Sequence, residues 1–105
     1  MKLYLKMNQE EDLYNEIISK YNFNEGQKNQ IKLGVNQGLN VSLYANPKFN
    51  HLQMKELRIA LEQGVDISNY SCPDFNDSKM REIRQVLKDG LNMNLYINPE
   101  FTLDK

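Results

Sequence analysis

The stretch from Phe49 to Asp74, FNHLQMKELRIALEQGVDISNYSCPD, decides the fold, because its pattern starts again elsewhere in the chain. The pattern also begins at Phe23 and Phe75, and a fourth copy begins at Phe101, so that successive phenylalanines are 26 residues apart. A fixed period of this length indicates one supersecondary unit that stacks on copies of itself.

Five kinds of residue recur at fixed places in the three units. They are asparagine (Asn24, Asn50, Asn76), a basic residue (Lys32, Arg58, Arg84), glycine (Gly38, Gly64, Gly90), tyrosine (Tyr44, Tyr70, Tyr96) and proline (Pro47, Pro73, Pro99). The asparagine is a favoured N-cap, and a glutamine three residues later in the first two units can complete a capping box. The glycine is a natural helix stop, because it tolerates a left-handed backbone.

Each unit is therefore predicted to be a long helix that ends at the glycine, followed by a one-turn helix. Ser42, Ser68 and Asn94 can cap that turn, and the proline after it ends it. We expect one all-α, solenoid-like domain built from three such units. The expected divisions are an N-terminal cap (1–22), the units 23–48, 49–74 and 75–100, and a truncated fourth unit (101–105), within a single domain 1–105.

The N-terminal segment does not match the repeat, and a solenoid needs an atypical first element to cover the end of its stack. Residues 9–20 predict a capping helix that Asn8 could start, with acidic residues in its first turn. Residues 2–7 alternate between apolar and other residues, which fits either a short strand or a lead-in to that helix.

One face of each long helix is apolar on a helical wheel and is predicted to be buried. Its members are Ile31 and Val35, then Met54, Leu57 and Leu61, then Met80, Ile83 and Leu87. Gly34 and Ala60 flank this face, and their small size would let a neighbouring helix approach closely.

Three apolar residues, Leu33, Leu52 and Ile59, fall on the opposite side of their helices. They can pack against an adjacent helix of the same chain, which is the simpler interpretation. They can also form an exposed apolar strip that binds a partner protein.

The basic column Lys32, Arg58 and Arg84 lies at the margin of the apolar face, and Arg81 adds to it. These side chains can extend over the core and pair with nearby acids such as Glu56. Alternatively, the column can bind phosphates or a carboxylate-rich partner.

Bulk properties exclude several classes of function. The net charge is −1, whereas a general nucleic-acid binder is expected to be basic. One cysteine (Cys72) and one histidine (His51) cannot build a disulfide framework or a zinc site. We expect Cys72 to be a free structural thiol and His51 a surface residue, and we predict no cofactor, no catalytic residue, no membrane span and a cytoplasmic location.

The unit resembles a tandem repeat of uncharacterised proteins from low-GC Gram-positive bacteria and their mobile elements, of the form F-x-x-x-Q-M-x-x-I-R-x-G-L-x-x-G-L-D-V-S-x-Y-A-x-P. The resemblance covers roughly residues 23–101, and the second unit carries most of it. The matching residues are Phe49, Gln53, Met54, Leu57, Arg58, Leu61, Gly64, Val65, Asp66, Ile67, Ser68, Tyr70 and Pro73, and the departures are Lys28, Lys79, Asn94, Ala60 and Val86.

The resemblance implies a small helical repeat in a mobile-element setting, with no catalytic residues to transfer. Small proteins of such elements often block host defence, which makes an inhibitor of a CRISPR nuclease the most specific hypothesis. The broader prediction is a non-catalytic protein-interaction module, with a monomer favoured over a homodimer. The alternative is a nucleic-acid binder that uses the basic column.

Overall fold

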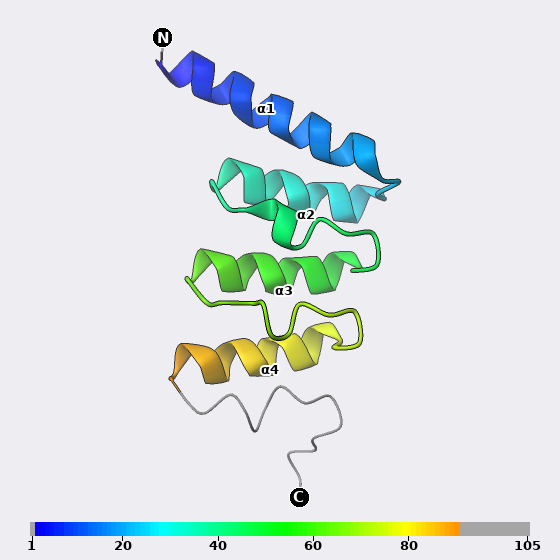
Figure 1. The fold of residues 1–105 in the computed structure, drawn as a ribbon, viewed down its shortest axis with the longest axis vertical. Helices are drawn as coiled ribbons and strands as arrows, with labels where there is room; N and C mark the ends of the chain where they lie inside the picture. The colour runs from blue at the N-terminus through cyan, green and yellow to red at the C-terminus, as the bar shows by residue number, and fades with distance from the viewer. Residues whose placement is uncertain (1, 91–105) are drawn as a thin grey trace, which may run out of the picture.

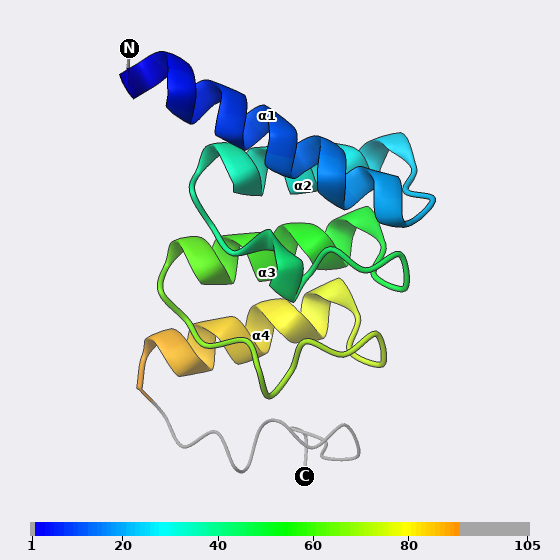
Figure 2. The same cartoon turned by 45° about the horizontal axis from the view of Figure 1, so that its top comes forward.

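The computed structural model describes residues 2–90, with side chains from residue 9 onward, and this part of the chain is helical and contains no strand. Its α-helices are α1 (Lys2–Lys20), α2 (Glu25–Asn36), α3 (His51–Glu62) and α4 (Asp77–Lys88), and a short 3-10 helix, η1 (Val41–Leu43), follows α2. In Figure 1, α2, α3 and α4 lie side by side and run in the same direction, with α1 tilted across the α2 end. The segments between them lie along one side of the row (Figure 2), so that each helix packs mainly on its neighbours in sequence.

The predicted helix starts are confirmed. Asn24, Asn50 and Asn76 are the N-caps of α2, α3 and α4, and each side chain accepts a hydrogen bond of 2.8 Å from the third amide of its helix. Capping boxes are complete in α2 and α3, because Gln27 and Gln53 accept from the backbone amides of Asn24 and Asn50.

The predicted glycine stops are also confirmed. Gly38, Gly64 and Gly90 have φ angles of 75°, 77° and 80°, which an L side chain rarely adopts. After α2, the amide of Gly38 donates to Val35 and that of Leu39 donates to Gly34, which is the pairing of a Schellman motif. Gly38 and Gly64 thereby turn the chain back toward the side on which the connecting segments lie (Figure 2).

Gln27 and Gln53 do more than cap their helices. The Gln27 Nε2 group donates to the carbonyl oxygens of Pro47 at 3.2 Å and Phe49 at 2.7 Å. Gln53 repeats both bonds with Pro73 and Phe75, at 3.2 and 2.7 Å. One buried amide side chain thus joins the start of a helix to the chain that leads into the next helix.

The core is one continuous cluster of buried apolar side chains that runs from α1 to α4. Ile31, Met54, Leu57, Met80 and Ile83 are fully buried, which confirms the apolar face predicted for α2, α3 and α4. The connecting segments contribute Val41, Tyr44, Ile67 and Tyr70, together with the phenylalanine that opens each unit (Phe23, Phe49, Phe75).

The prediction that a helix approaches Gly34 is wrong, because the connecting segment after α2 occupies that space. A Cβ atom on Gly34 would overlap the Tyr44 hydroxyl and a Val41 methyl group. The absent side chain lets the Tyr44 hydroxyl donate to the Gln30 carbonyl at 2.6 Å. In the second unit Ala60 stands at this place, and the buried Tyr70 hydroxyl has no partner among the described residues. Burial raises the pKa of both tyrosines, so both hydroxyls remain protonated donors.

At the N-terminus, the strand interpretation of residues 2–7 is wrong and the lead-in interpretation is correct. The helix α1 continues from Lys2 to Lys20, so that Asn8 lies inside it and the helix does not start there. A lone strand would leave its backbone groups unpaired, whereas a helix satisfies them internally.

The predicted caps of the one-turn helix are also wrong. Ser42 lies inside η1 and donates to the Asn40 side chain at 2.5 Å. In the second unit residues 68–70 form a turn and no helix, and the amide of Ser68 donates to the Asp66 carboxylate at 3.0 Å. That bond lowers the pKa of Asp66. In both units the serine therefore donates a hydrogen bond to the side chain two residues before it, through its hydroxyl at Ser42 and its amide at Ser68. The corresponding turn at Asn94 and the truncated fourth unit lie outside the described residues.

Replacing Tyr44 and Tyr70 by phenylalanine should have different effects on stability. We expect Tyr44→Phe to lose about 1 kcal/mol, because it removes a made and buried hydrogen bond. Tyr70→Phe should be neutral or stabilising, since it removes a buried hydroxyl that has no partner. Urea denaturation followed by circular dichroism measures both, and equal losses would contradict the proposed effect of Ala60.

The two roles of Gln53 can be separated by two substitutions. Gln53→Ala removes the capping box and both bonds to the following segment, and should cost about 2–3 kcal/mol. Gln53→Glu keeps an oxygen acceptor for the Asn50 amide but places a carboxylate against two carbonyl oxygens. If the bonds to Pro73 and Phe75 matter most, thermal denaturation will show Gln53→Glu to be at least as destabilised as Gln53→Ala. A near-native melting temperature for Gln53→Glu would leave the capping box as the main contribution.

Candidate functional site

The candidate site residues from the sequence fall into two sets, the basic column and the outward apolar residues. The structure places Arg58 at the contact between α2 and α3. Its Nε group donates to Gln30 at 2.8 Å and its Nη1 group donates to Gln37 at 3.1 Å. Glu62, one turn further along α3, lies 3.4 Å from the same Nη1 atom. Arg58 thus reaches back to the preceding helix and is held there by amide oxygens.

Arg84 makes the equivalent contact between α3 and α4, but with a carboxylate. Its Nη2 group lies 3.3 Å from Glu56, and its Nη1 group donates to Gln63 at 3.0 Å. Glu56 is only 4% exposed, and its second oxygen binds Arg81 at 3.2 Å. The Arg84 Nε atom is buried and has no partner among the described residues. Glu56 and Arg84 therefore form a buried ion pair, which the exposed Arg81 joins, and Gln30 stands at the position of Glu56 in the preceding contact.

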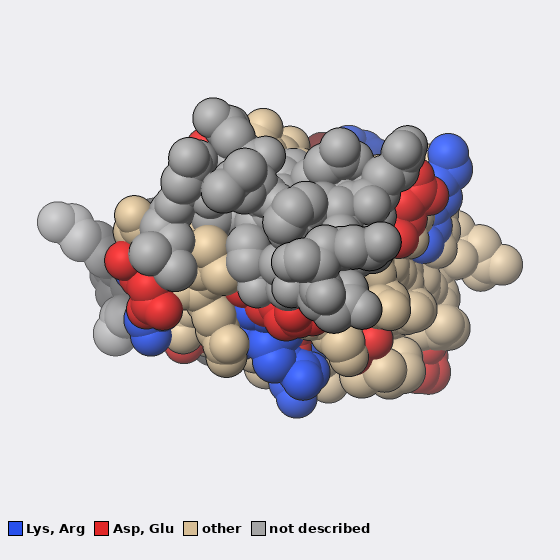
Figure 3. Space-filling view, turned by 90° about the horizontal axis from the view of Figure 1, so that it is seen from below, with Lys and Arg blue, Asp and Glu red and all other residues tan. Residues whose placement is uncertain are grey.

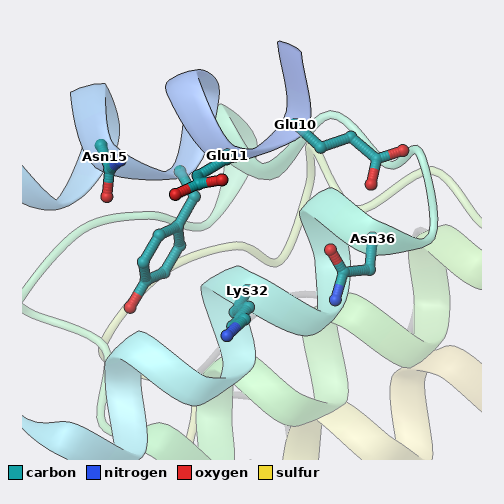
Figure 4. A pocket seen from close by; sticks show the side chains of 6 residues that line it. Glu10, Glu11, Asn15, Lys32 and Asn36 are labelled. Atoms are coloured by element: carbon teal, nitrogen blue, oxygen red, sulfur yellow. The ribbon is translucent and has the colours of Figure 1, made fainter. Parts of the chain in front are cut away.

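Lys32 occupies the same place on α2 and faces α1. Its ammonium group lies 6.0 Å from the centre of the Tyr14 ring, within reach of a cation–π interaction. The two residues border a hollow of about 420 Å³ between α1 and α2. Figure 4 shows Glu10, Glu11 and Asn15 on α1 across this hollow from Lys32 and Asn36 on α2.

The apolar residues Leu33, Leu52 and Ile59 do not enter the core. Leu33 is 37% exposed and Leu52 is 44% exposed, while Ile59 is partly exposed and lies outside the core cluster. Leu33 and Ile59 are at equivalent positions, 26 residues apart, on helices that bury equivalent faces and run in the same direction. Leu52 lies two turns before Ile59 on the same side of α3. We call these three residues the outer apolar row.

The charged groups of the described surface are mixed. Seen from the α4 end, lysine and arginine side chains lie directly beside aspartate and glutamate side chains (Figure 3). Within residues 2–90, no group of three or more histidine, cysteine, aspartate or glutamate side chains is placed to hold a metal ion. None of the described helices is long and apolar enough to cross a membrane.

Sequence reasoning missed the partners of the arginines. Gln30, Gln37 and Gln63 were not singled out, and Glu56 was considered only as a nearby acid. A signal was present in the sequence, because Glu56 and Gln63 stand 26 residues after Gln30 and Gln37. Each unit therefore has a polar residue two positions before and five positions after its basic residue. Alignment of the units at polar positions, and not at apolar ones alone, would have identified these acceptors.

Comparison with protein-family models, curated proteins and solved structures finds no match to this chain. The resemblance to the 26-residue tandem repeat therefore stays a prediction.

Removing the Glu56 carboxylate should destabilise the protein strongly. Glu56→Ala leaves Arg84 buried without its counter-ion and should cost about 2–4 kcal/mol. Glu56→Gln should cost much less, because glutamine fills the equivalent place opposite Arg58. Glu82→Ala, at the same position of α4 but exposed, is the matched control and should change stability by less than about 0.5 kcal/mol. Equal urea midpoints for the two alanine variants would contradict the role assigned to the buried ion pair.

Proposed function

We propose that this chain is a small solenoid-like repeat protein whose function is to bind another protein, without catalysis. The observation that carries this proposal is the outer apolar row. Leu33, Leu52 and Ile59 are large apolar side chains that lie outside the core on one side of α2 and α3. Apolar side chains gathered on one surface and bordered by charged ones are typical of protein-binding sites.

The repeat arrangement is part of the same proposal. Supporting it, equivalent residues of successive units make equivalent bonds: Gln27 and Gln53 with the following segment, and Arg58 and Arg84 with the preceding helix. Helices that lie side by side and run in the same direction (Figure 1) offer a continuous surface, which is how solenoid proteins bind extended partners.

The contacts of the basic column disfavour the alternative of nucleic-acid binding. Arg58, Arg81 and Arg84 are engaged with Gln30, Gln37, Glu56, Gln63, Glu62 and Asp77. An arginine already paired with a carboxylate contributes little net charge to phosphate binding, and affinity for nucleic acid depends on that charge.

The partner class that we propose to test first is a host defence nuclease, on the resemblance to mobile-element repeats. The chain would act as a cytoplasmic protein, and a monomer is favoured. Cys72, half-buried and free, fits a reducing compartment.

The proposal is tested by affinity capture from host cells with matched variants. We expect Leu33→Asp combined with Ile59→Asp to reduce capture of the partner by about tenfold or more, because charge is introduced into an apolar contact. Leu43→Asp is the control, since Leu43 is also exposed but lies in η1, among the connecting segments. Mass spectrometry with quantitative labelling measures the ratio.

Equal capture by the wild-type and the double variant would overturn the role of the outer apolar row. Titration of the wild-type protein with labelled RNA and DNA at two salt concentrations tests the alternative. Salt-sensitive binding that is lost on substitution of Arg81 would favour nucleic acid over a protein partner.

A further inference from the structure

Two carboxylates of α3 and α4 on the side of the outer apolar row are already paired with arginines of this chain. Glu62 lies 3.4 Å from Arg58 and also accepts a hydrogen bond from Gln37 at 2.9 Å. Asp77 lies 3.9 Å from Arg81, one turn further along α4. These acids are therefore engaged in contacts within the chain and are not placed to neutralise a further cation.

Lys55 lies within the outer apolar row and has no such partner. It follows Leu52 by three residues and precedes Ile59 by four, so the three side chains share one face of α3. Lys55 is exposed and forms no ion pair within the part of the chain that the structure describes. The equivalent residues of α2 and α4 are Asn29 and Arg81, neither of which is acidic. A positive charge without a counter-ion among the described residues therefore lies between two apolar side chains.

The α2 end of the row is electrically more balanced. Lys32 directly precedes Leu33, but Glu10 and Glu11 of α1 lie across the hollow from it (Figure 4). Carboxylates nearby reduce the field of an ammonium group. The unbalanced positive charge of this surface is therefore located at Lys55.

We propose that the partner bound by the outer apolar row presents an acidic amphipathic helix, whose apolar face covers Leu52 and Ile59 and whose carboxylate pairs with Lys55. This inference rests on the proposed function, since it names the chemistry of the partner at the same surface. Charge complementarity supports it, because removing water from an ammonium group is costly unless an opposite charge is supplied. A helix beside α3 matches the row, since helices share one rise per residue and place residues seven apart on one side.

The probe is a phage-displayed library of peptides about 18 residues long, which is long enough to form a helix. Leucine is fixed at two positions with the seven-residue spacing of Leu52 and Ile59, and the flanking positions vary among glutamate, glutamine and lysine. Selection uses the full chain, and the double variant Leu33→Asp with Ile59→Asp removes peptides that bind elsewhere. We expect glutamate to exceed lysine about fivefold or more at the flanking positions of the recovered peptides.

The affinity of a recovered peptide, measured by fluorescence anisotropy, tests Lys55 directly. Lys55→Glu should weaken binding about tenfold or more, and Lys55→Gln should weaken it less, because it removes the charge without reversing it. Both variants should remain folded, since the position is exposed. Lys48→Glu makes the same charge change in the segment between η1 and α3, and should alter the affinity less than about twofold.

Two results would overturn this inference and leave the proposed function standing. One is the recovery of peptides with as many lysines as glutamates, and the other is equal affinity of the wild-type protein and Lys55→Glu for a recovered peptide. Failure to recover any peptide that depends on Leu33 and Ile59 would count against both proposals. Binding to phosphatidylserine vesicles that is lost in Lys55→Glu would assign this surface to a membrane and contradict a helical protein partner.

Discussion

Gln27 and Gln53 fix the position of one helix relative to the segment that leads into the next. Each side chain makes hydrogen bonds both to the start of its own helix and to that segment. Its oxygen closes the capping box of its own helix, and its nitrogen holds two carbonyls some twenty residues later. A buried amide satisfies its oxygen and both of its hydrogens only if the helix start and the next segment stand at one separation. Burial without these bonds would be costly. The 26-residue spacing of the sequence therefore has a physical cause in the reach of one side chain.

The contact between α3 and α4 departs from that between α2 and α3 in two linked ways. Gln30 satisfies both of its neighbours, through its carbonyl to Tyr44 and its side chain to Arg58. Glu56 replaces it in the next unit, where Ala60 stands in place of Gly34 and a second arginine shares the carboxylate. Two buried donors, on Tyr70 and Arg84, have no partner in the described part of this contact. A buried ion pair also has a larger desolvation penalty than a neutral amide, so the second contact is the more polar and the less well satisfied of the two.

Features that depend on a few consecutive residues could be predicted from the sequence. The N-caps, the capping boxes and the left-handed glycines all follow from local backbone chemistry. The apolar face of each helix followed from periodicity alone.

The failures share a different property. The role of Gly34 depends on a tyrosine ten residues later, and the acceptors of Arg58 lie on another helix. The strand interpretation of residues 2–7 failed because alternation over six residues cannot reveal whether a partner strand exists.

A residue that recurs in every unit is therefore a poor guide to a binding site in this protein. The basic column recurs, and its arginines are used to join helices. Positions that change between units are better candidates, because the contacts between units do not fix them. The outer position is leucine at Leu33, isoleucine at Ile59 and glutamine at Gln85, so that the apolar row ends before α4. The acceptor position is glutamine at Gln37 and Gln63 but becomes acidic at Asp89, the C-cap of the last described helix. The exposed residues therefore differ along the stack of helices. Apolar side chains lie over α2 and α3, whereas carboxylates lie at the edge of α4.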